Sequence, residues 1–329
     1  MTVTVTGASG HIGNNLVRSL LAERRRVRCL VHADESAIKG LDLERVKGDV
    51  LRPESLAAAF SGAETVYHLA GRVSIVRDDE KVVHAVNVFG TRNVVDACLK
   101  CGVKRLIHFS SIHALRQDPQ DEPLTETRQL VEGDDLPPYD RSKSLGEKEI
   151  IAGLRRGLDA VVVNPSGIVG PYDFKPSPTG EMLLKLSCGK LSALVAGGYD
   201  WVDVRDVALG AIAAERKGKI GERYILSGEW VALKDLAAMW GEIARVKVPE
   251  LVFPLWLARL AAPFSTLYAE LIHSRPLFTS DSVKVVSKGN RHVSHAKATA
   301  ELGYHPRPIR RSLEDTYAWL VETGRLQSK

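Results

Sequence analysis

The sequence predicts an α/β fold in which a doubly wound parallel sheet carries a smaller, interwoven lobe toward the C-terminus. Two observations lead to this prediction. Segments with strand-like and helix-like patterns alternate through the first half of the chain, and a glycine-rich turn joins the first strand to the first helix. Alternation of this kind favours parallel strands with helices on both faces of the sheet.

The first strand and its turn lie at the N-terminus. Residues 2–6 alternate apolar and β-branched polar side chains, and Gly7, Gly10 and Gly13 follow before a helical pattern over Gly13–Glu23. Glycine lets the backbone approach a pyrophosphate closely, and the free N–H groups of a helix N-terminus attract phosphates. The spacing Gly-x2-Gly-x2-Gly differs from the fingerprint of many dehydrogenases. In the context of strand, turn and helix it still predicts a Rossmann-type dinucleotide site.

The remaining elements of the first half follow from the same two patterns. We expect strands at Val27–Val31, Arg45–Gly48, Thr65–Leu69, Arg105–Phe109 and Ala160–Val163. We expect helices at Pro53–Phe60, Val82–Leu99 and Ser142–Leu154. Ligands of such sheets bind at the carboxyl ends of the strands. The residues found at those ends, besides the glycine turn, are His32, Asp49, Ala70, Gly71, Ser111 and Pro165.

The pattern changes after Pro165. A turn-rich exit over 164–171 and a Pro/Gly-rich loop over 173–180 precede helical segments at Leu233–Arg245 and Ser312–Val321. We therefore expect a dinucleotide-binding domain over residues 1–168, to which 201–226 return, and a mainly substrate-binding lobe over 169–329.

The most apolar stretch is Leu251–Ile272. Pro254, Arg259, Pro263 and Glu270 interrupt it, so we expect no membrane span. A cover over a substrate pocket is favoured over a membrane-surface patch.

The composition is typical of a soluble globular enzyme. The 329 residues are 44% hydrophobic and 26% charged, with a net charge of +5, and Lys and Arg are spread along the chain rather than gathered in a nucleic-acid-binding stripe. Met1 leads directly into the first strand, and the four Cys form no disulfide framework, so we expect a cytoplasmic protein. Cys98 and Cys101 lie at a helix end and are interpreted as structural. The His residues lack metal-ligand spacing, so no metal is assigned.

The candidate chemistry lies in Tyr139-Asp-Arg-Ser-Lys143 together with Ser111. Residues four apart share one face of a helix, so the Lys143 ammonium can stabilise the Tyr139 phenolate and lower its pKa. Tyr139 would then give or take the proton of a carbonyl/alcohol couple, and the Ser111 hydroxyl would donate a hydrogen bond to the reacting oxygen. The cofactor would carry the hydride.

With these motifs the chain resembles the extended short-chain dehydrogenase/reductase family, of the NAD-dependent epimerase/dehydratase type. The resemblance is strongest over residues 1–171 and returns at Trp201-Val-Asp-Val-Arg-Asp-Val-Ala208. It is closest to the dihydroflavonol-reductase and 3β-hydroxysteroid-dehydrogenase branch, followed by the nucleotide-sugar epimerases. The resemblance implies a homodimer and a catalytic set of Ser111, Tyr139, Lys143 and Asn87, with Asn87 acting in active-site geometry and a proton relay.

The resemblance also assigns a cofactor contact to several strand ends. Asp49 would contact adenine, and Pro165 and Ile168 would lie beside the nicotinamide amide. The full predicted cofactor site is Gly7, Ser9, Gly10, His11, Ile12, Gly13, His32, Asp49, Val50, Leu69, Ala70, Gly71, Tyr139, Lys143, Pro165 and Ile168. We expect His11 to face cofactor or solvent. The predicted substrate contacts are Ser111, His113 and Tyr139.

The cofactor preference depends on the end of the second strand. NAD-preferring members usually carry an acid there, whereas this chain has Val31 and His32, with Asp34 and Glu35 slightly later. The Arg that usually binds the NADP phosphate is also missing. We favour NADP(H) over NAD(H), with His32 or an Arg of the 24–28 run as partner of the 2′-phosphate, although a solvated helix end is the favoured interpretation of that run.

Three functions remain open at this stage. The favoured one is hydride transfer between NADP(H) and a carbonyl or secondary alcohol of a small, hydrophobic substrate. An alternative is a nucleotide-sugar epimerase or dehydratase that retains NAD, and a second is a non-catalytic dinucleotide sensor. The segments that would select the substrate, 72–81, 113–138, 170–194 and 251–278, carry no readable code beyond the apolar character of the last one.

Overall fold

The fold is built on one seven-stranded parallel sheet. The computed structural model describes residues 2–73, 79–133, 136–257 and 289–327. The strand order is β10-β6-β5-β4-β1-β2-β3, and every neighbouring pair is parallel. The strands are β1 Thr2–Thr6, β2 Arg26–Val31, β3 Glu44–Lys47, β4 Thr65–His68, β5 Arg105–Phe109, β6 Ala160–Pro165 and β10 Arg223–Leu226. The predicted doubly wound fold is confirmed.

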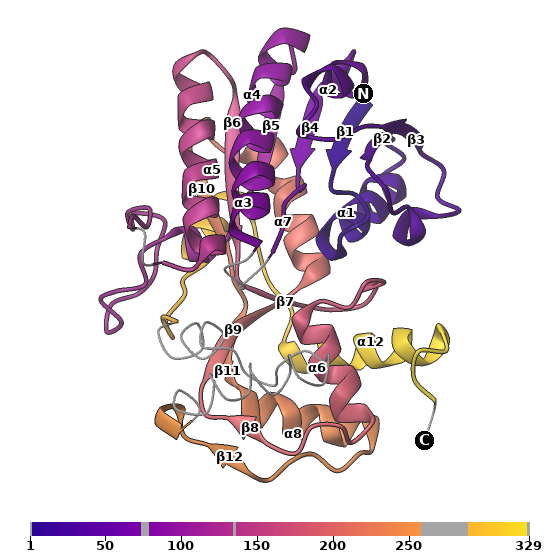
Figure 1. The fold of residues 1–329 in the computed structure, drawn as a ribbon, viewed down its shortest axis with the longest axis vertical. Helices are drawn as coiled ribbons and strands as arrows, with labels where there is room; N and C mark the ends of the chain where they lie inside the picture. The colour runs from indigo at the N-terminus through magenta and orange to yellow at the C-terminus, as the bar shows by residue number, and fades with distance from the viewer. Residues whose placement is uncertain (1, 74–78, 134–135, 258–288, 328–329) are drawn as a thin grey trace.

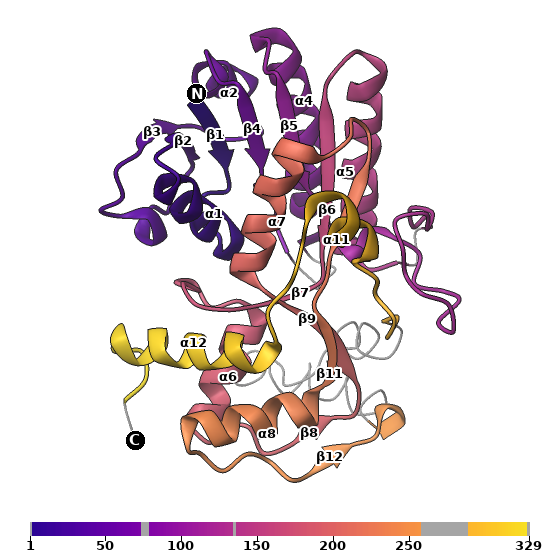
Figure 2. The same ribbon diagram turned by 180° about the vertical axis from the view of Figure 1, so that it is seen from behind.

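Helices cover both faces of this sheet, as the two opposite views show (Figures 1 and 2). One face packs against α1 (His11–Ala22), α7 (Val204–Lys217) and α11 (Ala296–Leu302). The other face packs against α2 (Pro53–Phe60), α4 (Gly90–Cys101) and α5 (Pro138–Arg155). Most apolar side chains of each layer are buried, and this burial is the main source of the stability of the sheet.

A second lobe lies beyond the carboxyl ends of the strands, in the lower half of Figure 1. Its strands form a three-stranded sheet and a short pair: β7 Gly167–Val169, β9 Gly198–Asp203 and β11 Glu229–Ala232, then β8 Leu194–Val195 and β12 Val252–Phe253. Its helices are α6 Pro178–Ser187, α8 Leu233–Ala244 and α12 Ile309–Glu322. Their core includes Trp201, Leu236, Trp240 and Leu313. The lobe is interwoven with the main sheet, since the chain leaves it through α7 to add β10.

Two helices differ from the prediction in a way that matters for the site. The stretch predicted as one helix over Val82–Leu99 consists of α3 (Glu80–His84), a π-helical turn η3 (Ala85–Phe89) and α4. A π turn shifts the apolar pattern by one residue, and a shift this small within one helical stretch is not distinguished from an uninterrupted α-helix. The helix predicted from Ser142 begins four residues earlier, at Pro138. Proline fits the first helical turn because the N–H that it lacks would have no partner there.

The other boundaries agree closely with the prediction, and β6 runs two residues further, to Pro165. Two single turns of 3₁₀ helix complete the elements, η1 at Ser36–Ile38 and η4 at Ile112–Ala114. The predicted apolar stretch Leu251–Ile272 lies outside the described residues from position 258 onward. Among the described residues, no helix is long and apolar enough to cross a membrane.

Candidate active site

The glycine turn lies at the carboxyl end of β1, against the end of β4. Gly7 has a φ of +72°, and a Cβ there would come within 2.6 Å of the Ala70 nitrogen. A Cβ on Gly13 would lie 2.1 Å from the Gly7 carbonyl oxygen, so neither position accepts a side chain. Gly10 is the exposed top of the turn and precedes the first residue of α1. The turn therefore brings bare backbone to the edge where ligands of parallel sheets bind.

The N-terminus of α1 fits a dinucleotide pyrophosphate. No side chain caps this helix, and its first turn holds no acidic residue. The first N–H groups of a helix lack partners within the helix, and together with the helix dipole they favour an anion. The His11 side chain is turned away from this turn, because its Nε2 lies 3.2 Å from the Gly170 oxygen and 3.0 Å from the Pro171 oxygen. The expectation that this side chain faces cofactor or solvent is therefore wrong, while the His11 N–H remains at the helix start.

Tyr139 and Lys143 lie in the first turns of α5, beside the end of β5. The Lys143 Nζ donates a 2.9 Å hydrogen bond to the Phe109 carbonyl and lies 5.9 Å from the centre of the Tyr139 ring. Gly71 faces the same ammonium, since a Cβ there would be 3.5 Å from the Lys143 Nζ. The structure thus brings together the ends of β4 and β5 and the start of α5, as the motif spacing predicted.

The electrostatics of the pair differ from the expectation. Burial raises the pKa of Tyr139 to about 12; a hydrogen bond with Ser111 opposes this shift and the Asp140 carboxylate adds to it. Burial lowers the pKa of Lys143 to about 8, against an opposing effect of Glu147. The pKa of Tyr139 was expected to fall, but the cost of burying a phenolate outweighs the ammonium, which is held at the Phe109 carbonyl. With this raised pKa, Tyr139 is a neutral phenol near pH 7.

Asn87 is buried in the π turn η3, where its amide connects two segments. Its Nδ2 donates to the Arg72 carbonyl at 3.0 Å and to the Ser142 Oγ at 2.9 Å, and its Oδ1 accepts from the Arg72 N–H at 2.8 Å. Ser142 in turn donates to the Tyr139 carbonyl. Asn87 thus fixes the chain after Gly71 against the start of α5, although it does not touch the Tyr139 hydroxyl.

Ser111 is buried at the end of β5, and its Oγ accepts a 3.2 Å hydrogen bond from the His113 N–H. The Asn164 amide supports it from β6, donating to the Ser111 carbonyl at 3.0 Å and to the Glu147 carboxylate at 2.7 Å. Arg223 of β10 completes this buried network with a 2.9 Å ion pair to Glu147. Sequence reasoning missed Asn164 and Arg223. Glu147 carried a signal, because it lies four residues after Lys143 on the same helix.

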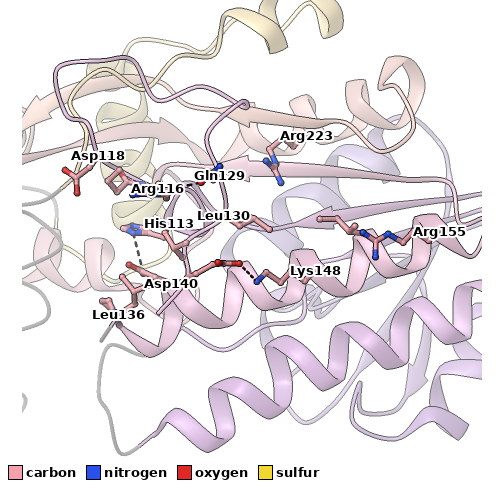
Figure 3. A pocket seen from close by; sticks show the side chains of 16 residues that line it. His113, Arg116, Asp118, Gln129, Leu130, Leu136, Asp140, Lys148, Arg155 and Arg223 are labelled. Carbon is pink, nitrogen blue, oxygen red and sulfur yellow. Dashed lines mark hydrogen bonds and ion pairs between the residues drawn. The ribbon is translucent and has the colours of Figure 1, made fainter. Parts of the chain in front are cut away.

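His113 lies between the two lobes at one end of a cavity of about 1290 Å³. Its Nδ1 is 3.5 Å from an Asp140 carboxylate oxygen, and its Nε2 is 3.1 Å from the Tyr199 hydroxyl. Figure 3 shows the His113–Asp140 contact at one end of the cavity, with Lys148 and Arg155 further along α5. Ser111 and Tyr139 do not line this cavity, which reaches the motif residues only beside His113 and Asp140.

The predicted adenosine end of the site lies at β2 and β3. His32 is exposed, with its Nε2 3.4 Å from the Asp49 carboxylate, and Val50 is buried in the core below Gly90. The Val50 carbonyl accepts from Asn93, so its side chain and its carbonyl both face the protein. Leu69 and Ile168 are partly buried against the main core, and Pro165 is the buried end of β6.

The arginine run at 24–28 does not lie at this edge. It spans the amino end of β2, opposite the carboxyl ends that carry the glycine turn. Arg25 forms a bidentate ion pair with Glu215, and Arg28 pairs with Glu44 at 2.9 Å. Arg25 thus connects the start of β2 with α7, and Arg28 connects β2 with β3. For these two side chains, both the predicted 2′-phosphate role and the interpretation as a solvated helix end are wrong.

Among the described residues, no group of three or more His, Cys, Asp or Glu side chains is arranged to hold a metal ion. The two cysteines of the Cys98-x2-Cys101 pair are free and lie in the last turn of α4. The other two cysteines, Cys29 in β2 and Cys188 directly after α6, are also free. Cys98 is fully buried, and burial raises the pKa of its thiol.

Comparisons with known proteins agree with this geometry. The model of the NAD dependent epimerase/dehydratase family matches residues 3–227. The chain is 36% identical to "Sterol demethylase protein B" of Methylococcus capsulatus, covering 98% of this chain and 99% of that protein. It is 32% identical to the "Putative dihydroflavonol 4-reductase" of Synechocystis sp., with coverages of 99% and 96%. The crystal structure of gox2253 superposes with a TM-score of 0.87 at 37% identity, covering 99% of each chain.

Proposed function

The chain belongs to the NAD dependent epimerase/dehydratase family of extended short-chain dehydrogenases/reductases, and from this premise we propose that it is an NADP(H)-dependent reductase. It would transfer a hydride between the nicotinamide and a carbonyl or secondary alcohol of a small hydrophobic substrate. The observation that carries the proposal is the convergence of Tyr139 and Lys143 at the start of α5 with Ser111 at the end of β5, beside the glycine turn. The Tyr139 phenol can donate a proton to a carbonyl oxygen, and positive charge from Lys143 and a bound nicotinamide would lower its pKa toward the working pH.

Each residue of the site has a distinct part in this proposal. The dinucleotide supplies the hydride when it is bound. The N–H groups at the start of α1 hold its phosphates, and Gly7 and Gly13 let the backbone lie close to them. Tyr139 donates the proton to the reacting oxygen, and the Ser111 hydroxyl, whose oxygen already accepts from His113, donates a hydrogen bond to the same oxygen. Lys143, fixed at the Phe109 carbonyl, supplies positive charge beside the phenol.

The preference for NADP(H) is supported by the end of β2. The strand ends at Val31, and the next side chain is the exposed His32, so no carboxylate stands at the position that binds the ribose hydroxyls in NAD-preferring members. The Asp34 carboxylate accepts from the Ser36 N–H, and this hydrogen bond lowers the pKa of Asp34. His32 is the side chain that we propose for the 2′-phosphate.

The hydrophobic character of the substrate is supported by the relatives. Their names connect this branch of the family with a sterol and a dihydroflavonol, both polycyclic compounds that carry hydroxyl or keto groups. We also propose a cytoplasmic homodimer. The free cysteines are consistent with a reducing compartment, and the exposed Val82 and Phe89 beside α4 and α5 offer an apolar contact surface.

The test is NADPH oxidation with a panel of hydrophobic ketones and aldehydes, using wild-type protein, Tyr139→Phe and a control. Tyr317→Phe is a matched control because Tyr317 packs against Trp240 in the second lobe, away from α5. We expect turnover by the wild type and the control, and a loss of about 10²- to 10⁴-fold in Tyr139→Phe. Turnover of nucleotide sugars with tightly bound NAD, and none of carbonyl compounds, would instead support the epimerase or dehydratase alternative.

A further inference from the structure

Three polar side chains form a continuous chain beside Tyr139. Asp140 comes from α5, His113 from η4 after β5, and Tyr199 from β9 of the second lobe. The His113 ring lies between two tyrosines, with its centre 6.1 Å from the Tyr139 ring and 6.0 Å from the Tyr199 ring. Tyr199 is partly buried, and its hydroxyl reaches across from β9 to the His113 ring at the end of β5.

The positions of Asp140 and Tyr199 on either side of the ring determine which nitrogen of His113 carries the proton. The Asp140 carboxylate lies 3.5 Å from Nδ1 and has only acceptor oxygens, so it favours the tautomer with N–H at Nδ1. The Nε2 of that tautomer is an acceptor. The Tyr199 hydroxyl, 3.1 Å from Nε2, must therefore donate its single proton to His113.

This arrangement leaves the Tyr199 hydroxyl able to accept a hydrogen bond from a ligand but not to donate one. Burial, together with the Asp140 carboxylate, raises the pKa of the Tyr199 phenol, so its proton stays in place. Because that proton is committed to His113, the Tyr199 oxygen can only accept from another molecule. A ligand group that meets it favourably must be a donor, such as a hydroxyl, whereas an ether or keto oxygen at this place would be repelled.

We propose that Tyr199, oriented by His113 and Asp140, is a specificity-determining residue that accepts a hydrogen bond from a substrate hydroxyl near the reacting carbonyl. The substrate class is then a hydroxy ketone or hydroxy aldehyde, or the corresponding diol in the reverse reaction. This proposal rests on the proposed function only in placing the substrate carbonyl at Tyr139. His113 and Asp140 are positioning residues, since they act through Tyr199.

The binding test compares ketones that differ only in this hydroxyl. The probes are benzoin with benzoin methyl ether, and 3-hydroxypropiophenone with 3-methoxypropiophenone, measured by calorimetry in the presence of NADP⁺. We expect the wild type to bind at least one hydroxy ketone about 5- to 10-fold more tightly than its ether. Tyr199→Phe should bind both members equally, and Tyr317→Phe should keep the preference. Equal binding of both members by the wild type, or a preference that survives in Tyr199→Phe, would overturn the proposal.

The tautomer provides a second, independent readout. A long-range ¹H–¹⁵N spectrum, with His113 assigned by its absence in His113→Gln, should show the Nδ1–H form, and Asp140→Asn should shift His113 toward a mixture. An Nε2–H form in the wild type would contradict the argument. Neither the calorimetric comparison nor the NMR measurement requires that the enzyme turn over a substrate. If the carbonyl panel fails while the hydroxyl preference holds, the proposed function fails alone; reduction without that preference removes only this inference.

Discussion

At the scale of single residues, the site is shaped by the cost of burying charge. Tyr139 and Lys143 share a helix face, as their spacing predicted, but their pKa values move toward the neutral forms. Spacing shows which groups meet, whereas the direction of a pKa shift depends on how much water reaches them, and a sequence does not contain that information. The same limit applies to Asp140 and Tyr199, whose contacts with His113 join segments far apart in the chain.

Lys143 gives a pH dependence of stability with a definite sign. Burial lowers its pKa from 10.5 to about 8, so between these values the unfolded chain binds more protons than the folded one. The free energy of unfolding must therefore rise with pH in this window. We expect the stability of the wild type relative to Lys143→Met to increase between pH 7.5 and 9.5, by on the order of 2 kcal/mol for this partly exposed side chain.

Urea unfolding of both proteins at several pH values measures this difference, in which the contributions of other titrating groups cancel. Lys148→Met is a suitable control, because Lys148 is an exposed residue of the same helix, paired with Glu132. A constant difference across the window, or one that falls as pH rises, would show that Lys143 is well solvated.

At the scale of elements, the strands and most helices could be predicted because their apolar patterns face one uniform core. The strand-end residues follow from the same pattern, since parallel strands all end at one edge. The π turn η3 and the early start of α5 could not be read in this way, because the π turn shifts the apolar pattern by only one residue and α5 begins at the second of two prolines. The strands of the second lobe are short, and they pair across long insertions that leave no periodic signal.

The π turn should contribute to stability through Asn87. In Asn87→Ala the N–H and carbonyl of Arg72 lose a partner at partly buried bonds, and the buried Ser142 hydroxyl loses the amide that donates to it. We expect the free energy of unfolding to fall by about 2–3 kcal/mol. Asn93→Ala, which removes the single bond to the Val50 carbonyl at the α4 surface, should cost about 1 kcal/mol. Urea unfolding of the two variants decides the point, and equal losses would mean that η3 is held by packing alone.

At the scale of the whole molecule, the C-terminal segment is joined to α7 by buried charges. Arg307 binds Asp206 through its guanidinium and its N–H, and it also lies 3.8 Å from the fully buried Asp203. Arg205 connects Asp203 with Asp315 of α12. These contacts fix α12 and the second lobe relative to α7, which packs on the main sheet, and so they position Tyr199 relative to Tyr139.

Removing Arg307 should therefore weaken the whole fold. Arg307→Met removes the guanidinium from the buried Asp206 carboxylate, which keeps a hydrogen bond from the backbone N–H of position 307, and we expect a loss of about 3 kcal/mol in the free energy of unfolding. Arg310→Met breaks an exposed pair with Glu242 and should cost less than about 1 kcal/mol. Thermal or urea unfolding compares the two, and a loss in Arg307→Met no larger than in Arg310→Met would contradict this account.

The central claim is that the protein is a reductase that exchanges NADP(H) with solution in each turnover. Its most direct test is a titration of the purified wild-type protein with NADPH and with NADH. The end of β2 offers a 2′-phosphate the exposed His32 and no carboxylate at Val31. We therefore predict a dissociation constant for NADPH about 10-fold or more below that for NADH. Tighter binding of NADH, or NAD that stays bound through purification, would contradict the claim and favour a family member that retains NAD.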